Sequence, residues 1–173
     1  NISEDIQILI LSVTILIYSI YLYTRTHQIF QHISLFYSSI FFLGSVGNII
    51  FSNIEPWAGG LFLISVGLIW GLYTLNEVLG PSWLGYFLST TTISIGSIIL
   101  MDNLFGNNDL LQIIILILGS VLFVWASIQL SEQVIFYIGG LGLVINLPRL
   151  ITELLPDNIW PPLILFLVGG VLV

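Results

Sequence analysis

One stretch of the sequence carries polar residues at a spacing that could bring them together inside a membrane. Gly139, Gly142, Asn146, Arg149 and Glu153 follow one another at spacings of 3, 4, 3 and 4 residues. In an α-helix this spacing places all five on one face. Arg149 is the only basic residue inside an apolar run, and a charge at membrane depth is commonly paired or functional. The stretch therefore predicts a polar stripe with a charged end.

Two interpretations of the charged end are open. In the first, Arg149 pairs with Glu153 or extends to the headgroups, because Pro148 and the polar turn that follows put both near a helix end. In the second, Arg149 is a buried functional charge. Together with Asn48 in an earlier run, Asn146, Arg149 and Glu153 are the candidate residues of a polar pathway or a buried polar cluster.

Four other apolar runs carry small or polar residues at helical spacing. They are Ser38, Ser45, Asn48 and Ser52; Gly60, Gly67, Gly71 and Thr74; Gly85, Ser89, Thr92 and Gly96; and Gln112, Gly119, Ala126 and Gln129. In lipid, small residues let helices approach closely, and interhelical hydrogen bonds add to the packing. We interpret the stripes as packing seams. The alternative is that some of them line a polar pathway.

Motifs for catalysis, metal binding or cofactor binding are missing from the sequence. It has no cysteine, no Gly-rich phosphate loop, no Gly-x-Ser-x-Gly and no His-Glu-x-x-His. His27 and His32 are five residues apart without a third ligand nearby, which favours an interfacial loop over a metal site. Glu77 precedes the turn at Gly80 and Pro81, so it is expected at the interface too. We therefore expect neither an enzyme nor a cofactor.

The composition requires an apolar environment around the chain. Of its 173 residues, 57% are hydrophobic and 6% are charged, whereas soluble domains carry roughly 25% charged residues. A surface with so few charges must face lipid. The chain has two basic residues in total, both arginine, and these are too few for a nucleic-acid interface. The expected partners are therefore the lipid bilayer and, beside it, other membrane helices or flanking domains of the same protein.

The stripes lie on apolar runs that are long enough to span a membrane as helices. Six complete runs are separated by polar or Pro/Gly turns, and a truncated seventh begins near residue 161. The complete runs are 6–24, 33–53, 57–79, 83–101, 110–130 and 134–152. Each is close to the roughly 20 residues that cross the hydrocarbon core. The predicted fold is an all-α integral membrane bundle of six full transmembrane helices plus a partial seventh, as an excerpt of a longer chain.

Internal similarity predicts tandem helical hairpins of about 50 residues. Two sets of residues recur at that interval: Gly67, Gly119 and Gly169, and Tyr37, Tyr86 and Tyr137. The candidate hairpin repeats are 34–79, 83–130 and 134–173, and residues 1–28 would be the second half of a clipped hairpin. All of them belong to one transmembrane domain, 1–173. Orientation is undetermined, because Arg25 lies in a loop on one side and Arg149 near the boundary of the other.

Two segments resemble bacterial multi-pass membrane proteins of unknown function: WAGGLFLISVGLIWGLYTL and GGLGLVINLPRLITELLPDNIWPPLILFLVGGVLV. Those proteins are built from successive two-helix units with glycine at the helix centres and turns that contain Pro and Trp. The resemblance covers residues 34–173, implies a bacterial plasma membrane and carries over no functional residue. We expect a non-enzymatic structural or interaction module. The alternative is a segment of a transporter or channel with a polar pathway along the small and polar helix faces.

Overall fold

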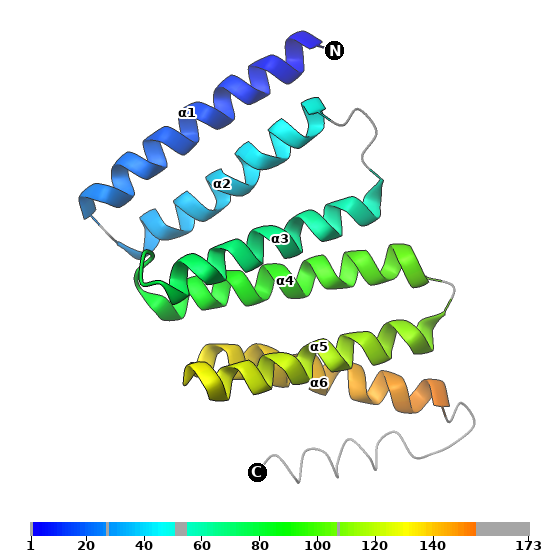
Figure 1. Cartoon of the computed structure of the whole chain (residues 1–173). Helices are drawn as coiled ribbons and strands as arrows, with labels where there is room; N and C mark the ends of the chain where they lie inside the picture. The colour runs from blue at the N-terminus through cyan, green and yellow to red at the C-terminus, as the bar shows by residue number, and fades with distance from the viewer. Residues whose placement is uncertain (1, 27, 51–54, 107, 155–173) are drawn as a thin grey trace. The chain divides into compact units, whose positions relative to one another are not determined.

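The computed structural model of the chain describes residues 2–26, 28–50, 55–106 and 108–154. In these ranges it contains six α-helices (Figure 1): α1 Ile2–Thr26, α2 Ile29–Ile50, α3 Pro56–Leu75, α4 Ser82–Phe105, α5 Asp109–Leu130 and α6 Gln133–Leu154. Each is long and apolar enough to cross a membrane. The prediction of an all-α chain with six membrane-length helices is therefore confirmed. The seventh run lies outside the described residues.

The helices do not begin where the apolar runs begin. Helix α1 starts at Ile2, so Glu4 and Asp5 lie in its first turn, where carboxylates complement the helix dipole. Helix α2 starts at Ile29 rather than at residue 33, and it therefore includes His32. Hydropathy predicts only the apolar part of a helix. The helix itself extends beyond that part, as far as its backbone hydrogen bonds continue.

Two helices end on a left-handed residue that is not glycine. Glu77, after α3, has a φ of 58°, and Ser131, after α5, has a φ of 55°. The N–H of Val78 donates to the carbonyl of Tyr73 at 3.0 Å, which is the hydrogen bond that closes a helix end of this kind. Both ends lie in the short connections expected from the sequence, and Glu77 is exposed there.

The chain divides into two compact units, residues 1–96 and 97–173. Unit 1 contains α1, α2, α3 and the first part of α4. In it, α1 and α2 lie side by side as an antiparallel pair (Figure 1). The hydroxyl oxygens of Ser19 and Ser34 lie 3.0 Å apart across this pair. A hydrogen bond between the two hydroxyls thus joins the two helices.

Helices α3 and α4 approach each other through their small-residue faces. A Cβ atom added at Gly67 would lie 2.9 Å from the Ser89 carbonyl oxygen, and one at Gly71 would lie 2.7 Å from the Ser89 hydroxyl. A Cβ at Gly96 would lie 2.8 Å from the Gly60 carbonyl oxygen. The Ser89 hydroxyl donates to the Gly67 carbonyl at 2.7 Å. Glycine is needed for this approach, and the packing seam predicted for these two stripes is confirmed.

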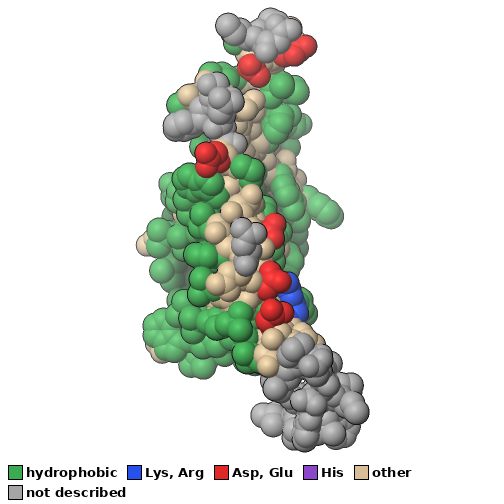
Figure 2. Space-filling model, turned by 90° about the vertical axis from the view of Figure 1, so that its right-hand side faces the viewer, with side chains coloured by type: hydrophobic (Ala, Val, Ile, Leu, Met, Phe, Trp, Pro, Cys, Tyr) green, Lys and Arg blue, Asp and Glu red, His purple; other side chains and the backbone are tan. Residues whose placement is uncertain are grey.

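The buried apolar core of unit 1 is small. Its members are Tyr23, Phe36, Val66, Trp70, Leu79, Leu84 and Leu88. The rings of Phe36 and Trp70 pack edge to face, with centroids 5.0 Å apart. Large apolar side chains lie outside the core, and hydrophobic side chains cover much of the face in Figure 2. Such a surface would be costly in water and is favourable against acyl chains.

In unit 2, α5 and α6 pack against each other through Gly139 and Gly142. A Cβ at Gly139 would lie 2.9 Å from the Ser120 carbonyl oxygen, and one at Gly142 would collide with the Ser120 hydroxyl. Among the described residues, a Cβ at Gly119 would meet no atom within 4 Å, so the stripe predicted for α5 does not contact α6 there. Ser120 instead faces α6, since one residue along a helix turns the side chain by about 100°.

The aligned positions of the predicted repeat have different surroundings. Gly67 lies in a close helix contact, whereas no described residue lies within 4 Å of a Cβ added at Gly119. Tyr86 is 8% exposed, whereas Tyr37 and Tyr137 are 60% and 67% exposed. The tandem repeat therefore stays a prediction from the sequence.

Candidate functional site

Four residues of unit 1 that are distant in the sequence form a polar cluster at one end of the helices. They are Tyr23 from α1, His32 from α2, Trp70 from α3 and Gly80 from the connection between α3 and α4; we call them the His32 cluster. The His32 side chain is fully buried, with 0% exposure. Its Nδ1 atom lies 3.0 Å from the Gly80 carbonyl oxygen. Its Nε2 atom lies 3.2 Å from the indole Nε1 of Trp70.

The partners of His32 define which ring nitrogen carries the proton. An indole N–H can only donate, so Nε2 must accept the hydrogen bond from Trp70. The proton of the neutral imidazole is then on Nδ1, which donates to the Gly80 carbonyl. Both nitrogens are therefore occupied. His32 is left without a lone pair that could bind a metal or act as a base.

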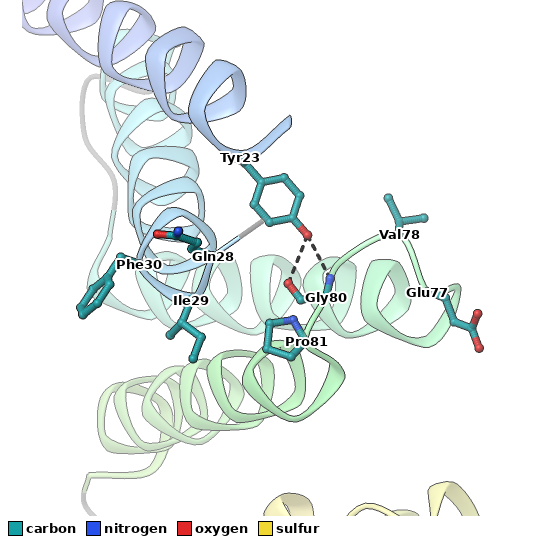
Figure 3. A pocket seen from close by; sticks show the side chains of 8 residues that line it. All are labelled: Tyr23, Gln28, Ile29, Phe30, Glu77, Val78, Gly80 and Pro81. Carbon is teal, nitrogen blue, oxygen red and sulfur yellow. Dashed lines mark hydrogen bonds between the residues drawn. The ribbon is translucent and has the colours of Figure 1, made fainter. Parts of the chain in front are cut away.

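Tyr23 holds the same connection from the side of α1. The Gly80 N–H donates to the Tyr23 hydroxyl at 2.9 Å, and that hydroxyl lies 3.3 Å from the Gly80 carbonyl oxygen (dashed lines in Figure 3). The ring of Tyr23 also packs edge to face on His32, with centroids 5.7 Å apart. The polar atoms of Gly80 are thus bound by α1 and α2, while Trp70 of α3 supports His32. The cluster fastens the α3–α4 connection to α1 and α2.

The expectation that His27 and His32 occupy an interfacial loop is wrong for His32. Helix α2 begins before it, and its imidazole points into the packed end of unit 1. His27 lies outside the described residues. The sequence offered little signal, because the partners of His32 are 38 and 48 residues away along the chain. In the described part of the chain, no group of three His, Cys, Asp or Glu side chains could hold a metal ion.

An open pocket lies beside the His32 cluster, at the ends of α1 and α3 and the starts of α2 and α4 (Figure 3). Its volume is about 690 Å³. The lining is mainly apolar, and Gln28 and Glu77, which carry its amide and carboxylate groups, lie far apart in Figure 3, where the Glu77 carboxylate points away from the other lining residues. The full lining is Tyr23, Gln28, Ile29, Phe30, Glu77, Val78, Gly80 and Pro81.

The predicted pathway residues do not form a buried polar site. Asn48 is exposed on α2. Asn146 is buried on α6, and its amide donates to the Gly142 carbonyl of its own helix at 2.9 Å. Arg149 and Glu153 are both exposed. Between residues 108 and 154 the structure has no ion pair joining them, so the interpretation of Arg149 as a buried functional charge is not supported.

The fold and the polar cluster define a broad class of protein. The described chain is all-α, with six helices that could each cross a membrane, and its polar cluster holds a connection rather than a reactive group. Comparison with protein-family models, with curated proteins and with solved structures finds no match.

Proposed function

We propose that the chain is a non-enzymatic, multi-pass membrane module whose role is structural or is to bind neighbouring membrane helices. Its location would be a plasma membrane of bacterial type. Six membrane-length helices with apolar exteriors support the membrane location. The observation that carries the role is the seam between α3 and α4, where the helix backbones touch across glycine.

That seam uses polar groups for packing. The Ser89 hydroxyl donates to the Gly67 carbonyl of the neighbouring helix instead of facing a channel. On the same two helix faces, the hydroxyls of Thr74 and Thr92 donate to carbonyls of their own helices at 2.9 and 2.7 Å. Among the described residues the buried side-chain atom without a partner is Oε1 of Gln31. A module in which nearly every buried polar atom is satisfied has few groups left to hold ions or water.

We also propose a seventh helix and an arrangement of the helices as hairpin repeats. A seventh helix beginning near residue 161 would pair with α6 and complete the last candidate hairpin. The candidate repeats would then be tandem hairpins of about 50 residues. What supports this scheme is the recurrence of Gly and Tyr in the sequence. The packed pairs α1–α2, α3–α4 and α5–α6 each join helices of two neighbouring candidate repeats, so the scheme rests on the sequence recurrence.

A transporter or channel segment is the second candidate. One observation favours it: α6 contains Pro148, which leaves the carbonyl one turn before it without a helical donor. Free carbonyls in interrupted helices commonly bind substrates or ions in transporters. However, α6 continues through Pro148 to Leu154, and nearby Asn146 donates to its own helix. The packing module is therefore better supported.

Cysteine accessibility distinguishes the two candidates. The chain has no cysteine, so single substitutions at Ser89 and Asn146 can be labelled without background in proteoliposomes. The packing module predicts that a charged, membrane-impermeant thiol reagent does not react at either position. Glu77→Cys, at a helix end, is the positive control and should react.

Labelling at both buried positions at rates close to that of Glu77→Cys would contradict the packing module and support a water-filled pathway. Each variant should first be shown to keep the α-helical circular dichroism of the unmodified chain, so that labelling reports access and not unfolding.

A further inference from the structure

We propose that the His32 cluster is a pH-sensitive contact, in which protonation of the buried imidazole releases α3 from α2. This inference goes beyond the proposed role as a packing module, because it gives unit 1 a second arrangement that acid selects. It does not depend on the seam between α3 and α4.

The hydrogen bonds of the cluster accommodate His32 only as the neutral ring. The Nε2 atom accepts the indole N–H of Trp70 at 3.2 Å, while Nδ1 donates to the Gly80 carbonyl at 3.0 Å. A proton added to the ring must bind Nε2, because that nitrogen holds the available lone pair of the neutral form. Two N–H donors would then face each other, and the bond to Trp70 would be lost. Since Nδ1 can still donate to Gly80, the loss falls on α3.

The described surroundings of His32 offer no partner for the added charge. Its hydrogen-bond partners are an indole and a backbone carbonyl, and neither is a carboxylate. From α1, the ring of Tyr23 packs edge to face on the imidazole, and tyrosine does not titrate in the mildly acidic range. On the α3–α4 connection, Glu77 directs its carboxylate away from the pocket (Figure 3). From α4, Leu84 and Leu88 supply apolar side chains to this core. A buried charge without a partner is costly, so the protonated ring favours an open arrangement.

Loss of the contact to Trp70 would open the buried core of unit 1. The indole packs on Phe36 with ring centroids 5.0 Å apart, and both side chains belong to that core. Leu79, which belongs to the same core, is 7% exposed and precedes Gly80 in the chain. When α3 separates from α2, we expect Leu79 to become accessible from the membrane surface.

Protons can reach the cluster from the membrane surface. His32 lies at the start of α2, and the ends of spanning helices lie at the level of the lipid headgroups. The open pocket beside the cluster is lined by Tyr23 and Gly80. In the closed arrangement the imidazole is 0% exposed, so it takes up a proton when the cluster opens. The bound proton then keeps the cluster open.

The direction of the pH effect follows from which arrangement binds the proton. A histidine ring that is free in water takes up a proton below about pH 6.5. Because the open arrangement binds a proton that the closed one excludes, the closed cluster is favoured above this pH and loses stability as the pH falls. One proton changes the equilibrium constant by at most about tenfold per pH unit.

The first test is unfolding in mixed micelles titrated with a denaturing detergent, at about pH 7 and at about pH 5.5. The equilibrium constant for unfolding should rise about three- to eightfold at the lower pH. His32→Gln, which cannot be protonated, should show no such rise, whereas His27→Gln, the control for the other histidine, should keep it. Trp70→Phe should show a smaller rise than the unmodified chain, because the neutral ring has then lost the same hydrogen bond.

The second test measures opening of the cluster itself. Leu79→Cys and Glu77→Cys lie on the same connection, and the chain has no other cysteine. In proteoliposomes, the labelling rate of Leu79→Cys by a membrane-impermeant thiol reagent is divided by that of Glu77→Cys at the same pH, which removes the pH dependence of the reagent. This ratio should rise severalfold at the lower pH, and it should not rise when His32→Gln is added to both variants.

Three results would overturn the proposal: an unfolding constant of the unmodified chain that is the same at both pH values, an equal rise in His32→Gln, or a labelling ratio that does not change with pH. If His32→Gln does not fold, Trp70→Phe decides in its place, and a rise as large as that of the unmodified chain would be the contrary result. Labelling of Ser89→Cys, by contrast, would contradict only the packing module.

Discussion

The α3–α4 seam makes a quantitative prediction for Gly67→Ala. The added Cβ would lie 2.9 Å from the Ser89 carbonyl oxygen and 3.2 Å from the Ile93 backbone nitrogen. Because these are backbone atoms, the helices must separate to relieve the contact. Overpacking of this kind costs about 1–3 kcal/mol. Separation also weakens the hydrogen bond from Ser89 to the Gly67 carbonyl, and such interhelical bonds are worth about 0.6 kcal/mol.

The chain contains a matched control for this substitution. Gly119 aligns with Gly67 in the sequence and lies in the middle of α5, but a Cβ there would meet no atom of the described residues within 4 Å. Ala is favoured over Gly in a helix by about 1 kcal/mol. Gly119→Ala should therefore leave stability unchanged or raise it by up to about 1 kcal/mol, whereas Gly67→Ala should lower it despite the same gain in helix propensity.

The assay is unfolding of each variant in mixed micelles titrated with a denaturing detergent and followed by tryptophan fluorescence. Gly67→Ala should shift the midpoint toward lower denaturant, and Gly119→Ala should not. If both variants shift equally, or if Gly67→Ala is the more stable of the two, close approach across glycine does not hold α3 against α4.

Three further substitutions test the described contacts by the same unfolding assay. His32→Ala should cost about 2–4 kcal/mol, because it leaves the buried indole N–H of Trp70 without an acceptor and opens a cavity; a loss below 1 kcal/mol would contradict the cluster. Tyr23→Phe should cost about 1 kcal/mol, whereas the exposed Tyr18→Phe in the same helix should cost nothing measurable; equal effects would exclude the bond to Gly80 as the cause. Arg149→Leu should change stability by less than about 0.5 kcal/mol, since Arg149 is exposed and unpaired in the described part of α6; a large loss would indicate a buried partner.

The six helices were predictable from the sequence because each contains a continuous apolar run of about 20 residues, the length that a helix needs to cross the hydrocarbon core. The seam between α3 and α4 was also predictable, since Gly67, Gly71, Gly85 and Gly96 recur at helical spacing in adjacent runs. The face of α5 was not. Gly119 and Ser120 are both small, and only the packing against Gly139 shows which of the two is covered.

The His32 cluster could not be predicted for a different reason. Its hydrogen bonds join Tyr23, His32, Trp70 and Gly80 across as many as 57 residues of sequence. No periodicity within one segment encodes such a set. The sequence also misled, because the apolar run of α2 begins after His32, so the residue looked like part of a polar loop. Its burial follows from where the helices meet.

The order of the His32 cluster along the chain has a consequence for biosynthesis. Tyr23 and His32 lie on α1 and α2, and they are translated well before Gly80 emerges from the ribosome. If the helices insert into a membrane in chain order, the groups that receive the α3–α4 connection would already be in the bilayer when α3 and α4 are inserted. Trp70 lies on α3 and is translated before Gly80 and α4, so it can meet the Nε2 atom of His32 before the connection arrives. Insertion in chain order would therefore assemble unit 1 by packing α3 and α4 against the α1–α2 pair that is already inserted. A variant without His32 would insert α1 and α2 normally but would fail to pack α3 and α4 against them.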